Sequence, residues 1–512
     1  MIEWIWCFRV GGTISGRGKA LLDFEKENLW LKKIKGESAV KRFRHDLALR
    51  IVKILDAVMI TIPFAICWYW YYSERTASPY HAKGDLLIIF IYFALYIIIG
   101  RVYDGFLMSM QRISEIIYSQ SLAFAVCDGI LYIIIWLLSK HLPNILPGLM
   151  AFCGQILLAA VWAYLANHWY FRTFPPCTTA VIYGRHSQMT KLIDEYGMNK
   201  KYDVKKTVSA AECIVHIEML ADMETVFLSG VHSHERNVIL KYCIARGITV
   251  YVVPCIGDVI MSGANPMHMF HLPLLQVKRY MAQPEYLFLK RAMDIFFSLA
   301  ALVIASPVMI VTAIAIKAED GGPVLYKQVR LTKNARPFEI VKFRSMQPDA
   351  EKDGVARLST GEKDDRITFV GRVIRKYRID ELPQLFNILE GSLSIVGPRP
   401  ERPEIAAQYC EHLPEFELRL QAKAGLTGYA QVYGKYNTTT PYDKLQMDLM
   451  YIAHPSLIED MKIVLATVKI LFKPESTEGV AEGQATAARL EMAAATDSEN
   501  TVQGKRCIKG IS

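Results

Sequence analysis

The sequence predicts a membrane protein that combines a helical transmembrane bundle of four spans with two α/β domains, the second of which contains a re-entrant membrane helix. Hydrophobic residues make up 52% of the 512 residues, a higher share than soluble domains usually have. Long apolar segments fill the first third of the chain, whereas short strand-like and helix-like runs alternate after about residue 178. Such alternation is typical of parallel α/β folds, and the length alone predicts more than one domain.

Four apolar segments predict the transmembrane bundle. Each is about long enough to cross a hydrocarbon core ~30 Å thick as a helix. A buried helical bundle is the alternative, but four such segments joined by short loops favour membrane spans. The segments are residues 51–72, 86–103, 117–138 and 145–166.

The distribution of basic residues predicts the orientation of this bundle. The loop after the first span contains only Arg75 and Lys83, and the loop after the third has little beyond Lys140. Because loops rich in Lys and Arg stay in the cytosol, the N-terminus is predicted to be cytosolic, and four spans return the chain there. The basic residues before the first span are Arg9, Arg17, Lys19, Lys26, Lys32, Lys33, Lys35, Lys41, Arg42, Arg44 and Arg50.

Charge and cysteine content narrow the class of partner. The formal charge of +9 fits a protein that works against anionic lipid and anionic substrates. A nucleic-acid partner is not expected, because the basic residues cluster beside apolar segments. The ten cysteines show no Cys-x-x-Cys spacing, so neither a zinc site nor a disulfide framework is predicted.

A small Rossmann-like α/β domain is predicted for residues 175–280. A dinucleotide-binding fingerprint needs three closely spaced glycines after the first strand, and only Gly184 stands in such a position. A structural, oligomerising or regulatory role is therefore favoured over dinucleotide binding. The predicted strands are 179–184, 225–229 and 248–253, and the predicted helices are 187–196 and 234–246.

A fifth apolar segment, residues 295–316, is interrupted by Ser306 and Pro307. A proline inside a helix removes one backbone hydrogen bond and bends the helix. Basic residues also flank the segment on both sides, which opposes a simple crossing. A re-entrant hairpin over residues 287–318 satisfies both observations, with an ordinary spanning helix as the alternative.

Two adjacent carboxylates, Asp380 and Glu381, form the first candidate site. They stand where a helix is expected to begin, with Pro383 in its first turn, and helix starts favour bound phosphate. Carboxylates beside clustered cations indicate a metal-assisted reaction at phosphorus, since Mg²⁺ prefers one or two carboxylates plus substrate phosphates. The competing interpretation is a solvated pair that caps the helix. The nearby cations are Arg372, Arg375, Lys376, Arg378, Arg399 and Arg402.

Seven motifs in this order resemble the catalytic domain of the bacterial sugar transferases, the monotopic polyprenol-phosphate phosphoglycosyl transferases, over about residues 286–473. Thr332 and Ala335 depart from the family, which usually has glycine in that turn. The motifs are Lys290-Arg291-Ala-Met-Asp294, Ser306-Pro307, the segment from Gly322 to Arg330, Lys342-Phe-Arg-Ser-Met346, Asp380-Glu-Leu-Pro-Gln-Leu385, Gly397-Pro-Arg-Pro400 and the segment from Lys423 to Gln431.

The resemblance implies a reaction and roles for the dyad. Asp380 would be the nucleophile and Glu381 the ligand of a Mg²⁺ cofactor. A sugar-1-phosphate would pass from a UDP-sugar to undecaprenyl phosphate through a phosphosugar–aspartate intermediate, with release of UMP. This reaction begins the synthesis of exopolysaccharide, capsule or O-antigen. The resemblance also implies the membrane hairpin, with Ser306 and Pro307 at its break.

Basic and amide side chains near the dyad are the candidate substrate-binding residues. Arg375 and Arg399 are the first candidates for phosphate contacts, because arginine recognises phosphate oxygens through paired donors. The further candidates are Lys342, Arg344, Gln328 and Arg330.

These predictions give a domain plan for a multi-pass protein of the bacterial inner membrane, with a cytosolic catalytic domain and a homodimeric state. A helix near residues 461–472 is expected either at the membrane interface or against the core. The domains are a basic cytosolic segment (1–48), the transmembrane domain (49–170), the Rossmann-like domain (175–280), the phosphoglycosyl transferase domain (284–473) and a disordered tail (474–512).

Two other functions compete with this one. Membrane-bound nucleotide-sugar dehydratases have a similar front half and a catalytic Tyr-x-x-x-Lys pair, a spacing that Tyr286 and Lys290 match. They also need a full dinucleotide fingerprint, which is missing here. A non-catalytic scaffold of a polysaccharide assembly complex is the second alternative, and the Asp380–Glu381 pair argues against it.

Overall fold

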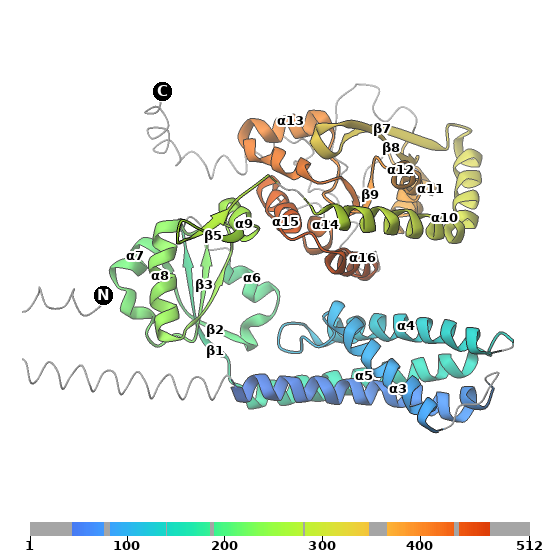
Figure 1. Ribbon diagram of the computed structural model, residues 1–512, viewed down its shortest axis with the longest axis horizontal. Helices are drawn as coiled ribbons and strands as arrows, with labels where there is room; N and C mark the ends of the chain where they lie inside the picture. Colours follow the sequence, from blue (N-terminus) through green and yellow to red (C-terminus); the bar gives the residue numbers. More distant parts are fainter. Residues whose placement is uncertain are drawn as a thin grey trace, which may run out of the picture. The chain divides into compact units, whose positions relative to one another are not determined.

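The computed structural model describes residues 43–75, 82–139, 141–184, 189–279, 282–347, 366–434 and 440–471. These form two compact units, Met1–Pro254 and Cys255–Ser512 (Figure 1). Most of the predicted basic segment 1–48 and the whole predicted tail 474–512 lie outside the described residues.

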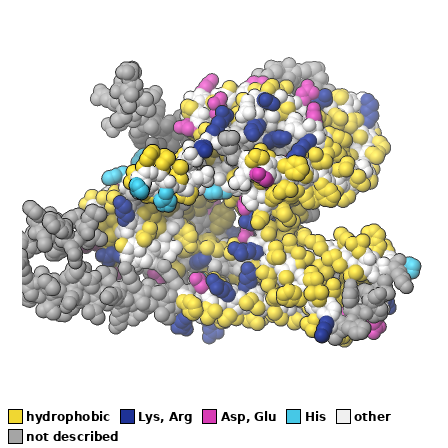
Figure 2. All heavy atoms as spheres, viewed as in Figure 1, with side chains coloured by type: hydrophobic (Ala, Val, Ile, Leu, Met, Phe, Trp, Pro, Cys, Tyr) yellow, Lys and Arg dark blue, Asp and Glu magenta, His cyan; other side chains and the backbone are white. Residues whose placement is uncertain are grey.

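Membrane helices dominate the first half of unit one. Within the described ranges, five helices are long and apolar enough to cross a membrane: Phe43–Arg75, Lys83–Val102, Ile113–Leu138, Leu146–Thr173 and Pro284–Asp320. The first four coincide with the four predicted spans, and the prediction of a membrane protein with several apolar helices is confirmed. Large side chains such as Trp70 and Leu137 are 84% and 76% exposed, as lipid-facing residues are. Figure 2 shows apolar side chains covering the helices of this bundle.

The helices α3 (Ala82–Val102), α4 (Ile113–Leu138) and α5 (Leu146–Thr173) enclose polar side chains. Asp56 is fully buried and accepts hydrogen bonds from Gln120 Nε2 at 3.1 and 3.0 Å and from the Tyr96 hydroxyl at 3.3 Å. The sequence offered no partner for this acid. Polar partners inside the bundle explain how a carboxyl group is tolerated there.

Unit one also contains a parallel α/β domain. Its sheet has the order β2-β1-β3-β4, and every neighbouring pair is parallel. Three of these strands match the predicted strands, whereas β2 was not predicted. β2 lies at the edge, and its exposed positions carry polar residues such as Lys205, so it has no apolar run. The strands are β1 (Cys177–Tyr183), β2 (Tyr202–Ser209), β3 (Thr225–Ser229) and β4 (Thr249–Val252).

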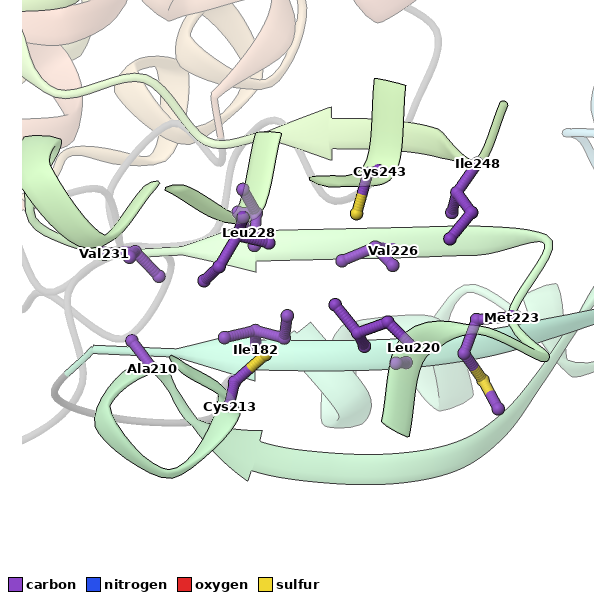
Figure 3. Close-up of a cluster of buried hydrophobic side chains, with 12 residues drawn as sticks. Ile182, Ala210, Cys213, Leu220, Met223, Val226, Leu228, Val231, Cys243 and Ile248 are labelled. Carbon is purple, nitrogen blue, oxygen red and sulfur yellow. The ribbon is translucent and has the colours of Figure 1, made fainter. Parts of the chain in front are cut away.

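The core of this domain lies between the sheet and its helices. Ile182 of β1 and Val226 and Leu228 of β3 pack against Cys213 of α7 (Ala210–Val215) and Cys243 of α8 (Ser233–Arg246). All five side chains are 0–1% exposed. Figure 3 shows these residues converging between the central strands and the helices. The other named helices are α6 (Met189–Glu195) and the short η3 (Met198–Lys200) and η4 (Ile217–Leu220).

Gly184, the single glycine of the incomplete fingerprint, has a packing role. A Cβ atom at this position would collide with the carbonyl of Gly230, just after β3. Its N–H also donates to the Ser229 carbonyl at 3.0 Å. Glycine is therefore required by the close approach of two strand ends, with no need to invoke a nucleotide.

Unit two begins before the predicted catalytic domain. Helix α9 (Ile256–Ser262) packs on α15 (Pro441–Ala453), where Val259 and Leu445 are buried together. Ser262 Oγ also lies 3.2 Å from His454 Nε2. The hairpin of β5 (Asn265–Met269) and β6 (Leu272–Gln276) follows. The unit that holds the parallel sheet therefore ends at Pro254, whereas the predicted α/β domain extends to residue 280.

Helix α10 (Pro284–Asp320) contains Pro307 and changes direction along its length (Figure 1). Because Pro307 has no N–H, the carbonyl of Val303 loses its helical partner. The hydroxyl of Ser306 donates to that carbonyl at 2.8 Å, which explains why serine precedes the proline. Apolar side chains such as Ile304, which is 79% exposed, cover this helix (Figure 2).

The rest of unit two is built on two small sheets. β7 (Leu325–Leu331) and β8 (Pro337–Phe343) are antiparallel, and β9 (Ser394–Val396) and β10 (Gly425–Thr427) are parallel. In α16, Ile463 is fully buried in the core, whereas Ile458 remains 68% exposed. Helix α16 is thus a core-facing helix that also presents an apolar face. The helices are α11 (Phe369–Lys376), α12 (Gln384–Glu390), α13 (Pro403–His412), α14 (Tyr429–Tyr433), α15 and α16 (Leu457–Leu471).

Candidate active site

The Asp380–Glu381 dyad lies in a single 3₁₀ turn, Ile379–Glu381, that precedes α12. The sequence placed these carboxylates at the start of a helix with Pro383 in its first turn, and this was wrong in detail. Pro383 is the N-cap of α12, and Arg378, which has a left-handed conformation with φ 57°, separates the turn from the preceding helix α11. Such a backbone at a non-glycine residue is strained, and strain of this kind concentrates at functional sites.

Glu381 is held by two cations. Its Oε1 accepts a hydrogen bond from Lys342 Nζ at 2.9 Å and lies 3.6 Å from Arg399 Nη2. Burial by itself would raise the pKa of this carboxyl group. The charges of Lys342 and Arg399 outweigh burial and lower the pKa well below its usual range, so Glu381 is ionised at neutral pH.

Asp380 has the opposite environment. Its Oδ1 is buried without a hydrogen-bond partner in the described part of the chain. Burial, and then the charge of Glu381, raises the pKa of Asp380, although Lys342 and Arg375 oppose the shift. One carboxylate is therefore fixed by cations, while its neighbour keeps an oxygen available for a ligand.

A narrow pocket opens beside Glu381. Three of its wall residues are cations that were predicted as substrate-binding residues: Arg330, Lys342 and Arg399. Such a set recognises phosphate oxygens. The complete lining is Arg330, Ile340, Lys342, Glu381, Gln384, Arg399, Pro400, Gly425 and Leu426.

The other predicted binding residues have different positions. Arg375 lies in the last turn of α11. Its Nη1 is buried without a partner among the described residues, and its charge acts on Asp380. Gln328 accepts hydrogen bonds from Arg330 Nε and Nη2 at 3.0 and 2.6 Å, and so orients that arginine. Arg344 does not line the pocket; its Nη2 pairs with Asp320 at the end of α10.

Helix α12 is fixed from two sides by residues whose roles were not predicted. Asn387 accepts from the Val341 N–H at 2.9 Å and donates to the Glu339 carbonyl at 2.8 Å, which docks the helix on β8. Arg291 donates to the last carbonyls of the helix, those of Ile388 at 2.6 Å and Leu389 at 2.7 Å. The Lys-Arg-x-x-Asp motif thus supports the dyad indirectly.

The same motif carries two further anchors. Asp294, 4% exposed, accepts from Ser394 Oγ at 2.8 Å. Lys290 Nζ and the Tyr286 hydroxyl both donate to Asp460 Oδ2 at 2.9 Å. Tyr286 and Lys290 are therefore engaged in tying α10 to α16, and the catalytic Tyr-x-x-x-Lys of the dehydratase alternative finds no support.

The segment that carries Arg399 is an extended strap, residues 397–402, pinned through its carbonyl groups. Arg419 Nη2 donates to the Arg399 carbonyl at 2.8 Å, and Arg330 Nη1 donates to the Pro400 carbonyl at 3.1 Å. A Cβ atom on Gly397 would collide with the carbonyl of Lys423. Close backbone packing therefore requires the glycine of the Gly-Pro-Arg-Pro motif.

A buried ion cluster lies behind the strap. Arg419, 3% exposed, binds Asp448 Oδ2 at 2.7 Å through Nη2 and lies 3.5 Å from Glu401 Oε1. Burial alone would raise the pKa of Glu401, but the charges of Lys444, Arg419 and Arg330 outweigh it and lower the pKa. Burial raises the pKa of Asp448 despite the opposing charge of Arg419. The residue types in the sequence did not predict this cluster.

The turn between β7 and β8 shows how the two family departures are accommodated. Ala335 adopts φ 57°, a conformation that glycine tolerates best. Thr332 has an ordinary φ of −120°, and its hydroxyl donates to the Ser392 carbonyl at 3.1 Å and accepts from the Ala424 N–H at 3.2 Å. Threonine therefore gains contacts there that glycine lacks.

The residues at the dyad fit a magnesium ion held mainly by substrate. In the described ranges, no three His, Cys, Asp or Glu residues gather into a metal cage. Mg²⁺ commonly binds through one or two carboxylates plus substrate phosphates. Glu381, which is ionised and lines the pocket, could supply one such carboxylate.

Comparison with known proteins gives consistent matches. A sequence model of the family described as Bacterial sugar transferase matches residues 285–474. The UDP-N-acetylgalactosamine-undecaprenyl-phosphate N-acetylgalactosaminephosphotransferase of Aeromonas hydrophila is 36% identical over 49% of this chain and 58% of its own length. The UDP-glucose:undecaprenyl-phosphate glucose-1-phosphate transferase of Caulobacter vibrioides is 39% identical over 36% of this chain and 71% of its own. The exopolysaccharide production protein PSS of Rhizobium leguminosarum is 41% identical over 36% of this chain and 94% of its own length.

Proposed function

Because this chain belongs to the bacterial sugar transferase family, we propose that it transfers a sugar-1-phosphate from a UDP-sugar to undecaprenyl phosphate and releases UMP. Family membership confirms the resemblance predicted from the motifs and the assignment to the transferases. The names of two relatives, which act on undecaprenyl phosphate with UDP-N-acetylgalactosamine or UDP-glucose, support the proposed acceptor and the class of donor. The product would enter exopolysaccharide, capsule or O-antigen synthesis.

The first half of the proposed reaction takes place at Asp380. A carboxylate oxygen attacks the phosphorus that bears the sugar, and the bond from that phosphorus to the oxygen of the UMP phosphate breaks. UMP leaves with the bonding electrons, and the phosphosugar remains esterified to Asp380. The observation that carries this role is the buried, unpartnered Oδ1 of Asp380, next in the chain to Glu381, which lines a pocket with three cations.

The second half returns the enzyme to its starting state. An oxygen of undecaprenyl phosphate attacks the same phosphorus, and the Asp380 carboxylate is the leaving group. Lys342, Arg330 and Arg399 offset the repulsion between anionic substrates and stabilise charge on the departing phosphate. Glu381 would hold Mg²⁺, which when bound neutralises charge on the donor's diphosphate.

The proposed location of the reaction is the cytosolic face of the bacterial inner membrane. The basic N-terminal segment and the polar break in α10 support a chain whose N-terminus and catalytic domain share that side. Helix α10 would enter one leaflet, turn at Ser306 and Pro307 and return. The exposed apolar side chains of α10, the proline inside it and its change of direction (Figure 1) support this course.

Pre-steady-state kinetics test the mechanism. Purified full-length protein, mixed with UDP-sugars but no acceptor, is expected to release a stoichiometric burst of UMP with one of them, with ping-pong kinetics when undecaprenyl phosphate is added. Asp380→Asn should abolish both the burst and covalent labelling by the phosphosugar, because an amide cannot attack. Glu381→Gln should be severely impaired and partly restored at high magnesium.

Two outcomes would contradict this mechanism. A burst from Asp380→Asn would refute the nucleophile assignment. UMP release that requires both substrates would replace the covalent route by direct transfer. Absence of UMP release with any UDP-sugar would instead favour the scaffold alternative.

A further inference from the structure

One side chain in the pocket lacks the partner that its burial demands. Gln384, the first residue of α12, is 3% exposed and lines the pocket three residues after Glu381. Its Nε2 is buried without a hydrogen-bond partner among the described residues. Buried polar groups are almost always paired, so an unpaired buried amide needs an explanation.

Asn387 of the same helix provides the contrast. It is also 3% exposed, but its amide oxygen accepts from the Val341 N–H and its amide nitrogen donates to the Glu339 carbonyl. Asn387 is thus a structural amide whose bonds are complete in the protein alone. Gln384 occupies an equally buried position with its donor unused.

The surroundings of Gln384 determine which ligand fits it. Arg330, Lys342 and Arg399 share the pocket wall, so the space favours an anion. Phosphate oxygens only accept hydrogen bonds, and the amide nitrogen can donate two. We infer that Gln384 is a substrate-binding residue whose side-chain amide donates to a phosphate oxygen of a bound substrate.

This inference rests on the proposed function and extends it. Two sources can supply the phosphate, the diphosphate of the nucleotide donor and the phosphate of the polyprenol acceptor. Both present anionic oxygens that accept from the amide. Kinetics of the two half-reactions separate them.

Gln384→Met is the informative variant, because methionine has a similar volume and no polar atom. Loss of one hydrogen bond to a charged group lowers the relevant kcat/KM by about 10- to 100-fold. The midpoint of thermal unfolding should stay the same or rise, since an unpaired buried amide is removed. Asn387→Leu is the matched control: it should lower the unfolding midpoint, because it leaves the Val341 N–H and the Glu339 carbonyl unpaired.

The measurements use full-length protein in detergent. If the donor phosphate is the ligand, Gln384→Met lowers the kcat/KM of the half-reaction that releases UMP. If the acceptor phosphate is the ligand, the UMP burst is unchanged and the KM for undecaprenyl phosphate rises. Either result supports the phosphate contact. Unchanged constants for both substrates, or a loss of activity that follows a fall in the unfolding midpoint, would overturn it.

A binding measurement with UDP separates this inference from the proposed reaction. UDP should stabilise the wild-type protein by RT ln(1 + [UDP]/Kd) and so raise its unfolding midpoint. Gln384→Met should need about 10-fold more UDP for the same shift, consistent with one lost charged hydrogen bond. Equal shifts in both proteins, or no shift in either, together with unchanged kinetics for undecaprenyl phosphate, would refute the role of Gln384. Failure of wild-type protein to release UMP would instead count against the proposed function.

Discussion

Arg419 donates a hydrogen bond from Nη2 to the backbone carbonyl of Arg399 at 2.8 Å, while the side chain of Arg399 reaches Glu381 at 3.6 Å. A buried arginine that does not itself line the pocket thereby sets the position of one that does. Asp448 and Glu401 hold Arg419 in turn. We expect Arg419 to act as a positioning residue through Arg399.

A double-mutant cycle tests this coupling. Arg399→Ala should lower kcat/KM for UMP release by ~10²–10³-fold, the usual value of one positioned electrostatic contact. Arg419→Lys keeps the charge but loses the forked geometry of the guanidinium group. It should lower kcat/KM by about 10-fold, which is the effect of losing one ordinary hydrogen bond. If Arg419 acts through Arg399, Arg419→Lys should change kcat/KM little in the Arg399→Ala background. Equal losses in both backgrounds would show a general structural role.

The β7–β8 turn offers a stabilising substitution. Ala335→Gly should raise the free energy of unfolding by about 1 kcal/mol, because a residue with a Cβ atom is strained at φ 57°. Thr332→Gly is the control and should lower stability, since it removes the two hydrogen bonds of the threonine hydroxyl. Thermal unfolding of the purified variants measures both effects. A destabilised Ala335→Gly protein would show that the left-handed backbone carries no strain.

Acid pH should reveal the ion cluster behind the strap. The pKa of Glu401 is lowered in the folded protein, so its ionised form stabilises the fold above its unfolded value of 4.5, and this stability is lost as pH falls through the folded pKa. Glu401→Gln should therefore unfold at a lower temperature than wild type at pH 7, and the difference should shrink below pH 4.5. The charge of Glu401 is also one of the causes that raise the pKa of Asp448, so the same comparison in an Asp448→Asn background isolates the effect of Glu401. A difference that stays constant from pH 7 to pH 3.5 would contradict the lowered pKa.

Cysteine labelling in intact cells tests the re-entrant course of α10. In a cysteine-free background, Glu411→Cys on the exposed face of α13 should resist a membrane-impermeant reagent added from outside, because the catalytic domain is proposed to be cytosolic. His141→Cys, in the predicted external loop after the third span, should react and serves as the positive control. Ready labelling at position 411 in intact cells would mean that α10 crosses the membrane.

Local sequence patterns alone were enough to predict the apolar helices and three of the strands. The apolar segments were found because a lipid-facing helix must be hydrophobic along its whole length, and β1, β3 and β4 because each is a short run rich in apolar and β-branched residues. The carboxylates of Asp380 and Glu381 and the cations Lys342 and Arg399 were identified from their chemistry. Strand β2 was not predicted, because Lys205 and Lys206 at its centre leave no such run.

The tertiary structure alone determined which partners these residues have and which of them line the pocket. The left-handed Arg378 separates the turn of the dyad from α11, and Arg344 pairs with Asp320 and does not line the pocket. The support of Arg399 by Arg419 depends on hydrogen bonds between residues 20 positions apart. The unpaired amide of Gln384 is visible only once its neighbours are known. Burial and pairing are properties of the packed chain, because the same side chain is paired or unpaired according to what the fold brings beside it.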